Sequence, residues 1–468
     1  MSNRVNPSQF FQKYSPLQLQ KIKSNWKEFF KEDIFQILTS GNNENSHINS
    51  FPINFDSYGA LYPDFSFFEE FRDNHFRAGI KSHFSQDKYS LFKIFEAKNN
   101  YPLLEKAIQQ LTNEDDKAFY LSSILNKFSK AKNYIPVLPT IEYNNYLDSF
   151  YKIWNEFHFK KLNEKLSKKI SDEQPDKIVF FIHGYNVPYS LAAIQGIQMY
   201  QHLVSFDPSQ KILFIPVFWV SNAEKNCNLD NLSQINISDK KNIKNARSWF
   251  YYSNHAYFAA TGLRKVIVDL EQSNKNLDQF YLISHSLGAT VATSAFINTT
   301  SKLQTKFRKK IYNQSCQGSR ILIKKNKQRA FGKIEPINKK IIDKFNEVPF
   351  PKSKFRIFMS APAIPGRSTF MDMCEDHKNR FSIFSTINIS DKTLQKKYLG
   401  FPMASILGNT TLGLNKRNES VKTKNLYFSK HGSFEYNTTP MSHRDHNIFE
   451  YMSKDIFQNL LKNFFNPT

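Results

Sequence analysis

The segment Gln279–Thr290 places one serine in the setting that a nucleophilic serine requires. Phe280–Ile283 is a short apolar run typical of a buried strand, and the Ala/Thr/Val stretch after Gly288 can form a helix. Ser286 therefore falls on a tight turn between a strand and a helix, where its hydroxyl would be exposed. Such a turn is strained and needs small neighbours, and Ser284 and Gly288 are both small. The alternative is that Ser286 only caps the helix.

Candidate acids and bases follow this serine along the chain. A serine hydroxyl becomes a good nucleophile when a base removes its proton and a third group orients that base. We predict Ser286 as the nucleophile and Asp391 as the orienting acid, with Asp376 as the alternative acid. The base is one of two histidines shortly before the last helix, His443 or His446.

Acyl transfer through a serine also needs backbone N–H groups that stabilise an oxyanion. Leu287, the residue after the nucleophile, would supply one of them. We predict the Tyr185 N–H as the second, since Tyr185 follows a buried strand and the preceding Gly184 allows close approach of the backbone. We expect His183 to order this loop and His285 to pack beside the site.

Buried apolar runs alternate with amphipathic helices after residue 175. The strands we expect cover residues 177–182, 212–220, 280–283, 355–360 and 381–389. This alternation predicts an α/β fold with a doubly wound, mostly parallel sheet. We expect residues 1–170 to form a mostly helical N-terminal region and residues 171–468, which begin with a polar linker, to form the sheet domain. The last helix should bury Phe449, Met452, Ile456 and Leu460.

The charge of this 468-residue chain is strongly positive, with 64 Lys and Arg against 41 Asp and Glu. Residues 302–356 alone hold 17 Lys and Arg and three acidic residues. This basic insertion is either a solvated surface excursion or a cap beside the site that contacts an anionic membrane surface. The three cysteines have neither zinc-site nor disulfide spacing, so we expect no metal and no cofactor. We see no signal peptide and no membrane-spanning stretch, and we expect a cytoplasmic protein.

Several motifs together resemble a known family. They are Ile-Val-Phe-Phe-Ile-His-Gly-Tyr-Asn (178–186), Ser-His-Ser-Leu-Gly-Ala (284–289), Ser-Ala-Pro-Ala (360–363), Asn-Ile-Ser-Asp-Lys-Thr-Leu (388–394) and His-Asn-Ile-Phe (446–449). Over residues 175–465 the chain resembles a bacterial family of α/β-hydrolases of unassigned substrate. The resemblance implies Ser286, Asp391 and His446 as the catalytic residues. Two departures are Ala363, where the family has aspartate, and Ser284, where it has glycine or alanine.

These observations predict a serine hydrolase that cleaves a carboxylic ester through an acyl-enzyme. The aromatic content and the positive charge suggest a lipid ester, and an amide is equally compatible with the residues. The alternative is a catalytically silent hydrolase fold that binds an anionic membrane or a nucleic acid.

Overall fold

The computed structural model describes a little under half of the chain. The described residues are 49–55, 59–61, 140–185, 187, 189–219, 221, 237–296, 348–364, 381–388, 390–391, 393–394, 397–398, 401–402, 435–441 and 446–466. Most of the N-terminal region, residues 302–347 of the basic insertion, Asp376 and His443 lie outside these residues, so the predictions made for them stay predictions.

A seven-stranded sheet forms the centre of the described structure. Its order is β1-β3-β2-β4-β5-β6-β9, and every neighbouring pair is parallel. The strands are β1 (Ile53–Asn54), β2 (Lys177–Ile182), β3 (Ile212–Phe218), β4 (Gln279–His285), β5 (Lys354–Ser360), β6 (Phe381–Asn388) and β9 (Glu435–Met441). A separate antiparallel pair consists of β7 (Lys397–Tyr398) and β8 (Phe401–Pro402). The predicted parallel sheet is therefore present.

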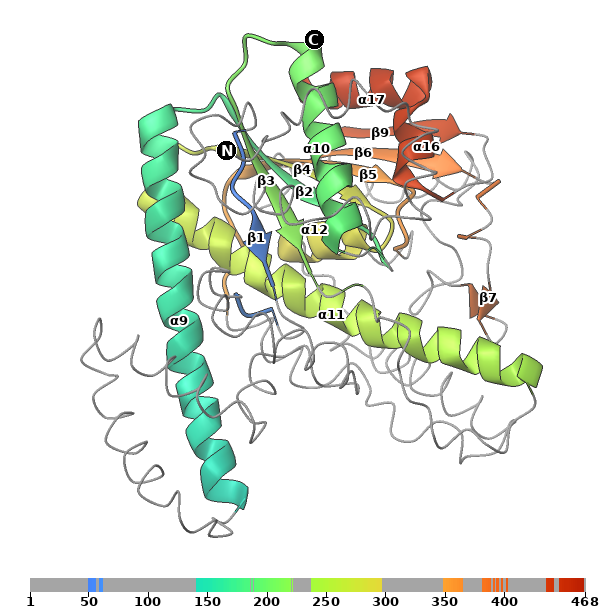
Figure 1. Ribbon diagram of the computed structural model, residues 1–468. Helices are drawn as coiled ribbons and strands as arrows, with labels where there is room; N and C mark the ends of the chain where they lie inside the picture. The colour runs from blue at the N-terminus through green and yellow to red at the C-terminus, as the bar shows by residue number, and fades with distance from the viewer. Residues whose placement is uncertain are drawn as a thin grey trace, which may run out of the picture.

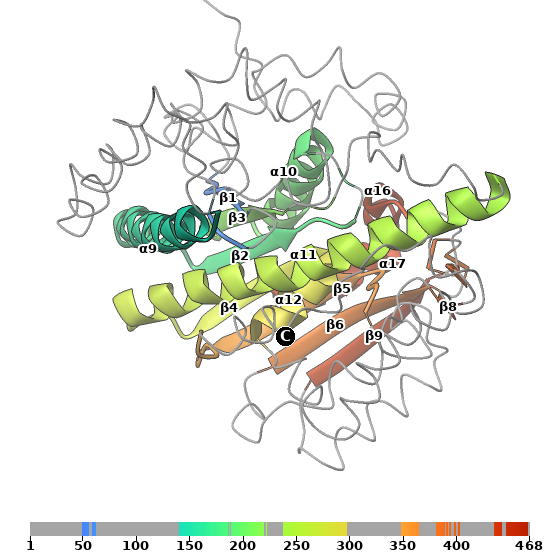
Figure 2. The ribbon, with the colours of Figure 1, turned by 90° about the horizontal axis from the view of Figure 1, so that it is seen from below.

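Helices cover both faces of the sheet (Figures 1 and 2). On one face, α10 contacts α16 and α17, while α11 and α12 pack together on the other face and α9 lies against α11. The helices are α9 (Thr140–Glu173), α10 (Tyr189–Phe206), α11 (Ile237–Ser273), α12 (Gly288–Phe296), α16 (Ile448–Met452) and α17 (Asp455–Phe465). In the part of the chain that is described, no helix is long and apolar enough to cross a membrane.

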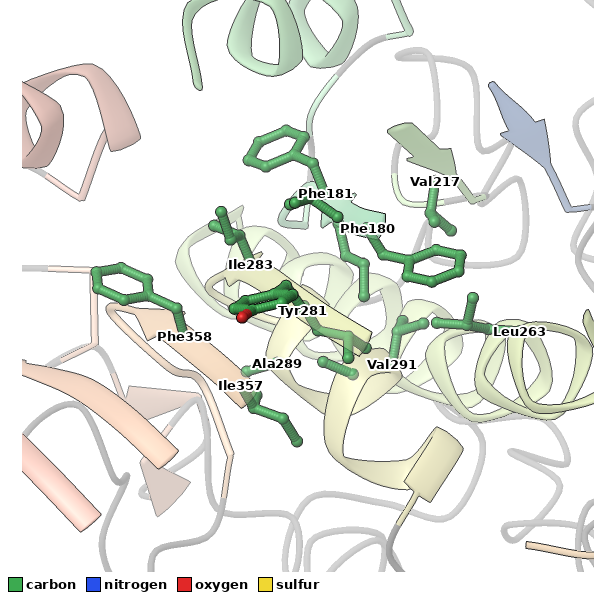
Figure 3. Packing of buried hydrophobic residues seen from close by; sticks show 14 of the residues in the cluster. Phe180, Phe181, Val217, Leu263, Tyr281, Ile283, Ala289, Val291, Ile357 and Phe358 are labelled. Carbon is green, nitrogen blue, oxygen red and sulfur yellow. The ribbon is translucent and has the colours of Figure 1, made fainter. Parts of the chain in front are cut away.

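The central strands are mostly apolar because both of their faces are covered. Every residue of β3 is buried, and so is every residue of β4 after Gln279. Figure 3 shows how side chains alternate across the sheet, with Ile357 and Phe358 pointing to opposite sides. Burial on both faces explains why these strands were visible in the sequence as continuous apolar runs.

Three details differ from the sequence-based expectation. The sheet does not begin at residue 171, because β1 pairs with β3 and α9 runs to Glu173 in place of a linker. The strand β9 was not predicted. The C-terminal helix is interrupted at Ser453 and Lys454, which shifts the helical phase and leaves Ile456 45% exposed.

Candidate active site

The carboxyl ends of four parallel strands carry the predicted site residues. Chain segments leaving β2, β4, β6 and β9 hold, respectively, the predicted oxyanion loop, Ser286, Asp391 and His446. The strand order reverses between β2 and β4, since β3 lies on one side of β2 and β4 on the other. Open α/β sheets bind ligands at such a switch point.

Ser286 lies on a tight turn between β4 and α12. Its φ angle is +53°, in the left-handed region that a non-glycine residue occupies only when the surroundings enforce it. Two backbone hydrogen bonds hold the turn: the Ser286 N–H donates to the Ser360 carbonyl over 2.9 Å, and the Ala363 N–H donates to the Ser286 carbonyl over 3.0 Å. The loop after β5 therefore holds the serine in its strained conformation.

The residues two positions before and after Ser286 are both small and have different surroundings. A Cβ atom at Gly288 would lie 2.5 Å from the carbonyl oxygen of His183, so a larger residue would push α12 away from β2. Ser284 is fully buried, and its hydroxyl donates a hydrogen bond to the Phe358 carbonyl over 3.2 Å. The serine that replaces the usual glycine or alanine thus has a hydrogen-bond partner.

Ser286, His446 and Asp391 form one hydrogen-bonded chain. The distance from Ser286 Oγ to His446 Nε2 is 2.7 Å, and the distance from His446 Nδ1 to Asp391 Oδ2 is also 2.7 Å. A carboxylate accepts hydrogen bonds, so Nδ1 of a neutral His446 carries the proton and Nε2 offers its lone pair to the serine hydroxyl. This arrangement can move a proton from Ser286 to His446.

Asp391 is fully buried and accepts hydrogen bonds at both oxygens. Oδ1 accepts from the N–H groups of Thr393 and Leu394, and Oδ2 accepts from His446 and from the Tyr451 hydroxyl over 2.9 Å. Burial opposes ionisation of this carboxyl. The hydrogen bond and charge of His446, with the Leu394 N–H and the Tyr451 hydroxyl, outweigh burial and lower the pKa of Asp391 below its ordinary value. Asp391 is therefore held as a carboxylate.

The loop after β2 is fixed by the end of β3. The Trp219 N–H donates to Nε2 of His183 over 3.3 Å, and the Trp219 indole N–H donates to the His183 carbonyl over 2.9 Å. The two rings stack at 5.7 Å between centroids. Burial lowers the pKa of His183 to about 4, and a hydrogen bond to the Gly184 carbonyl partly opposes this, so the histidine is neutral. His183 thus orders this loop.

The two predicted oxyanion donors lie in the segments that follow β4 and β2. The hydrogen bonds of the described residues leave the Leu287 N–H uncommitted at the start of α12. Tyr185 is half-buried and packs against the core. A Cβ atom at Gly184 would lie 3.0 Å from the Cβ of Ser286, so the loop that carries Tyr185 passes directly beside the nucleophile.

Two residues that contact this site were not predicted from the sequence. Tyr451 is fully buried in α16, and its hydroxyl accepts a hydrogen bond from the Asn388 side chain over 3.1 Å. Asn388 also accepts from the Ser390 N–H and so shapes the turn before Asp391. The one available signal was the position of Tyr451 in the first helix after His446. Among the described residues, no group of His, Cys, Asp and Glu could hold a metal ion.

The sheet order, the helices on both faces and the serine turn between β4 and α12 define an α/β-hydrolase-type fold. Residues 159–317 match the model of a family described as "Alpha/beta hydrolase of unknown function (DUF900)". The matched segment begins in the middle of α9, extends past α12, and includes the loop after β2 and Ser286. No curated protein and no solved structure matches the chain.

Proposed function

We propose that this chain is a serine hydrolase that cleaves carboxylic esters through an acyl-enzyme. The observation that carries the proposal is the hydrogen-bonded chain from Ser286 through His446 to the buried Asp391. A serine that only caps a helix needs neither an aligned imidazole nor a carboxylate behind it. The strained backbone of Ser286 supports the same conclusion, because strain of this kind gathers at functional sites.

The proposed reaction has two half-reactions. Ser286 Oγ attacks the ester carbonyl carbon while its proton passes to His446 Nε2, and the carbonyl oxygen becomes an oxyanion that accepts hydrogen bonds from the Leu287 and Tyr185 N–H groups. The intermediate collapses, the bond to the alkoxide breaks, and His446 gives the proton to the departing alcohol. Water then repeats the sequence with His446 as base, releasing the acid and restoring the Ser286 hydroxyl. Asp391 stays ionised throughout and stabilises the imidazolium.

The first test is covalent labelling by a fluorophosphonate, followed by peptide mapping. We expect one label on Ser286, none on Ser286→Ala, and full labelling of the control Ser284→Ala, which changes the buried neighbouring serine. His446→Ala and Asp391→Asn should lose activity by a factor on the order of 10⁴, the usual cost of losing a triad member. Labelling of folded Ser286→Ala at the wild-type rate would refute the assignment.

The base is tested by a pair of histidine variants. His443→Ala should retain most of the activity that His446→Ala loses, because His446 makes the hydrogen bond to Ser286. A dead His443→Ala with an active His446→Ala would overturn the assignment of the base.

A panel of p-nitrophenyl esters of increasing acyl length, with matching anilides, tests the substrate class. Faster turnover of esters than of anilides would support an esterase, and a preference for long acyl chains would extend the proposal to lipid esters. A folded protein that neither labels nor turns over any ester would favour the alternative of a silent fold. In that case binding to anionic vesicles should depend strongly on salt and survive Ser286→Ala.

A further inference from the structure

His285 is a buried, titratable side chain that takes no part in the proton transfers above. It is the last residue of β4 and directly precedes Ser286. Its Nε2 atom lies 2.8 Å from the carbonyl oxygen of His446, and the two imidazole rings lie 5.0 Å apart between centroids. The side chain before the nucleophile therefore contacts the backbone of the residue assigned as the base.

The partners of His285 define its protonation state. A carbonyl oxygen can only accept, so Nε2 of His285 must carry a hydrogen and donate it to His446. Nδ1 is buried and has no hydrogen-bond partner among the described residues, so a second proton there would create a buried charge without an acceptor. Burial and, next, the charge of His446 lower the pKa of His285 to about 3, which agrees with a neutral ring.

The opposite edge of the ring faces the loop after β2. A Cβ atom at Gly184 would lie 2.8 Å from Nδ1 of His285. The ring of Tyr451 lies edge-on at 6.5 Å between centroids. His285 thus fills the space between the predicted oxyanion loop and the segment that carries His446, and its own backbone continues into Ser286.

We infer that His285 is a positioning residue which, as a neutral imidazole protonated at Nε2, fixes the backbone of His446 and so sets the approach of His446 to Ser286. The His446 ring is held at Nδ1 by Asp391 and its backbone is held by His285, so both ends of this residue are restrained. Without the second restraint the ring can pivot about Asp391. A displacement of about 1 Å can cost a factor on the order of 10² in rate. The inference rests on the proposed function, which it deepens.

Two variants of matched length isolate the hydrogen bond. Gln and His place a nitrogen the same number of bonds from Cα, so His285→Gln can still donate to the His446 carbonyl, whereas His285→Met has similar length and no donor. Active sites are counted by fluorophosphonate titration, so that unfolded protein does not enter the rates. We expect His285→Met to lose about tenfold or more in kcat and in labelling rate per active site with KM unchanged, and His285→Gln to stay within about threefold of wild type.

Nuclear magnetic resonance of ¹⁵N-histidine-labelled wild type gives a readout independent of any variant's stability. We expect His285 to be neutral and protonated at Nε2 from pH 5 to pH 8, with its signals assigned by their absence from His285→Gln. The low-field Nδ1 proton of His446 should broaden in His285→Met and stay sharp in His285→Gln. If His285→Met does not fold, the inference is tested by the tautomer of His285 in the wild type and by the rate of His285→Gln.

Three results would overturn the inference: wild-type His285 protonated at Nδ1, a His285→Met variant with wild-type rates per active site, or a His285→Gln variant as slow as His285→Met. Failure of the proposed function looks different, because wild-type protein would then not be labelled at all. The tautomer of His285 can be measured in either case.

Discussion

Replacing Tyr451 by phenylalanine tests how the buried carboxylate of Asp391 is held. Tyr451→Phe removes only the hydroxyl that donates to Asp391 Oδ2 over 2.9 Å and keeps the buried ring. Hydrogen bonds to charged groups contribute about 1.5–3 kcal/mol to stability. Three other donors to Asp391 remain, and Asn388 loses one acceptor, so we expect the free energy of unfolding to fall by about 2 kcal/mol near pH 7.

The loss should depend on pH in a defined direction. The pKa of Asp391 is lower in the folded protein than in the unfolded chain, so its contribution to stability is present above the unfolded value of about 3.9 and disappears as pH falls through the folded value. Without the Tyr451 hydroxyl the folded pKa moves upward. The difference in unfolding free energy between wild type and Tyr451→Phe should therefore be largest above about pH 5 and shrink below about pH 4.

Urea unfolding of both proteins between pH 3.5 and pH 7 measures this difference. Tyr281→Phe is the matched control, since it makes the same chemical change in β4, where Tyr281 contacts the rings of Phe464 and Phe465. We expect the control to change stability by less than about 0.5 kcal/mol. A Tyr451→Phe protein within that same margin, or a loss that does not vary with pH, would refute this account of Asp391.

Two further variants test the elements that hold the nucleophile turn. Arg264 in α11 is fully buried and donates hydrogen bonds to the carbonyls of Ser294 and Ala295 at the end of α12, at 2.6 and 3.0 Å. Arg264→Met should therefore lower the free energy of unfolding, measured by urea titration, by about 3 kcal/mol. An unchanged urea midpoint would contradict this role of Arg264. Gly288→Ala should reduce the rate of fluorophosphonate labelling of Ser286 by more than about tenfold, because the added Cβ would lie 2.5 Å from the His183 carbonyl oxygen. Labelling at the wild-type rate would show that the turn tolerates a larger residue.

The central strands were predictable because they are buried on both faces. Their continuous apolar runs mark them in the sequence, and the polar residues that follow them fall at the site. Ser286, Asp391 and His446 could be proposed from the sequence because Ser286 follows one predicted strand, Asp391 comes shortly after another, and His446 shortly precedes the last helical segment. Their separations in the folded chain could not be derived from residue types alone.

The two edge strands of the sheet could not be predicted from the sequence, for a physical reason. The strand β9 contains Thr438, Thr439 and Pro440, and among the described strands it pairs with β6 alone. An edge strand needs neither a continuous apolar run nor an N–H at every position. At the other edge, β1 is two residues long and carries no measurable period. Both strands are specified by the partner that they pair with.

The short helix α16 connects Tyr451, which was not predicted from the sequence, with the predicted residues His446 and Asp391. His446 lies two residues before α16, Asn447 caps the helix by accepting from the Phe449 N–H, and Tyr451 lies one turn further on. The first of these residues and the last both donate to Oδ2 of Asp391. One oxygen of a buried carboxylate thus fixes both the imidazole and the helix that follows it, while His285 holds the His446 carbonyl from the side of the nucleophile. His446 is therefore restrained by residues at the ends of two strands far apart in the sequence, β6 and β4, and neither restraint can be recognised before the sheet brings those strands together.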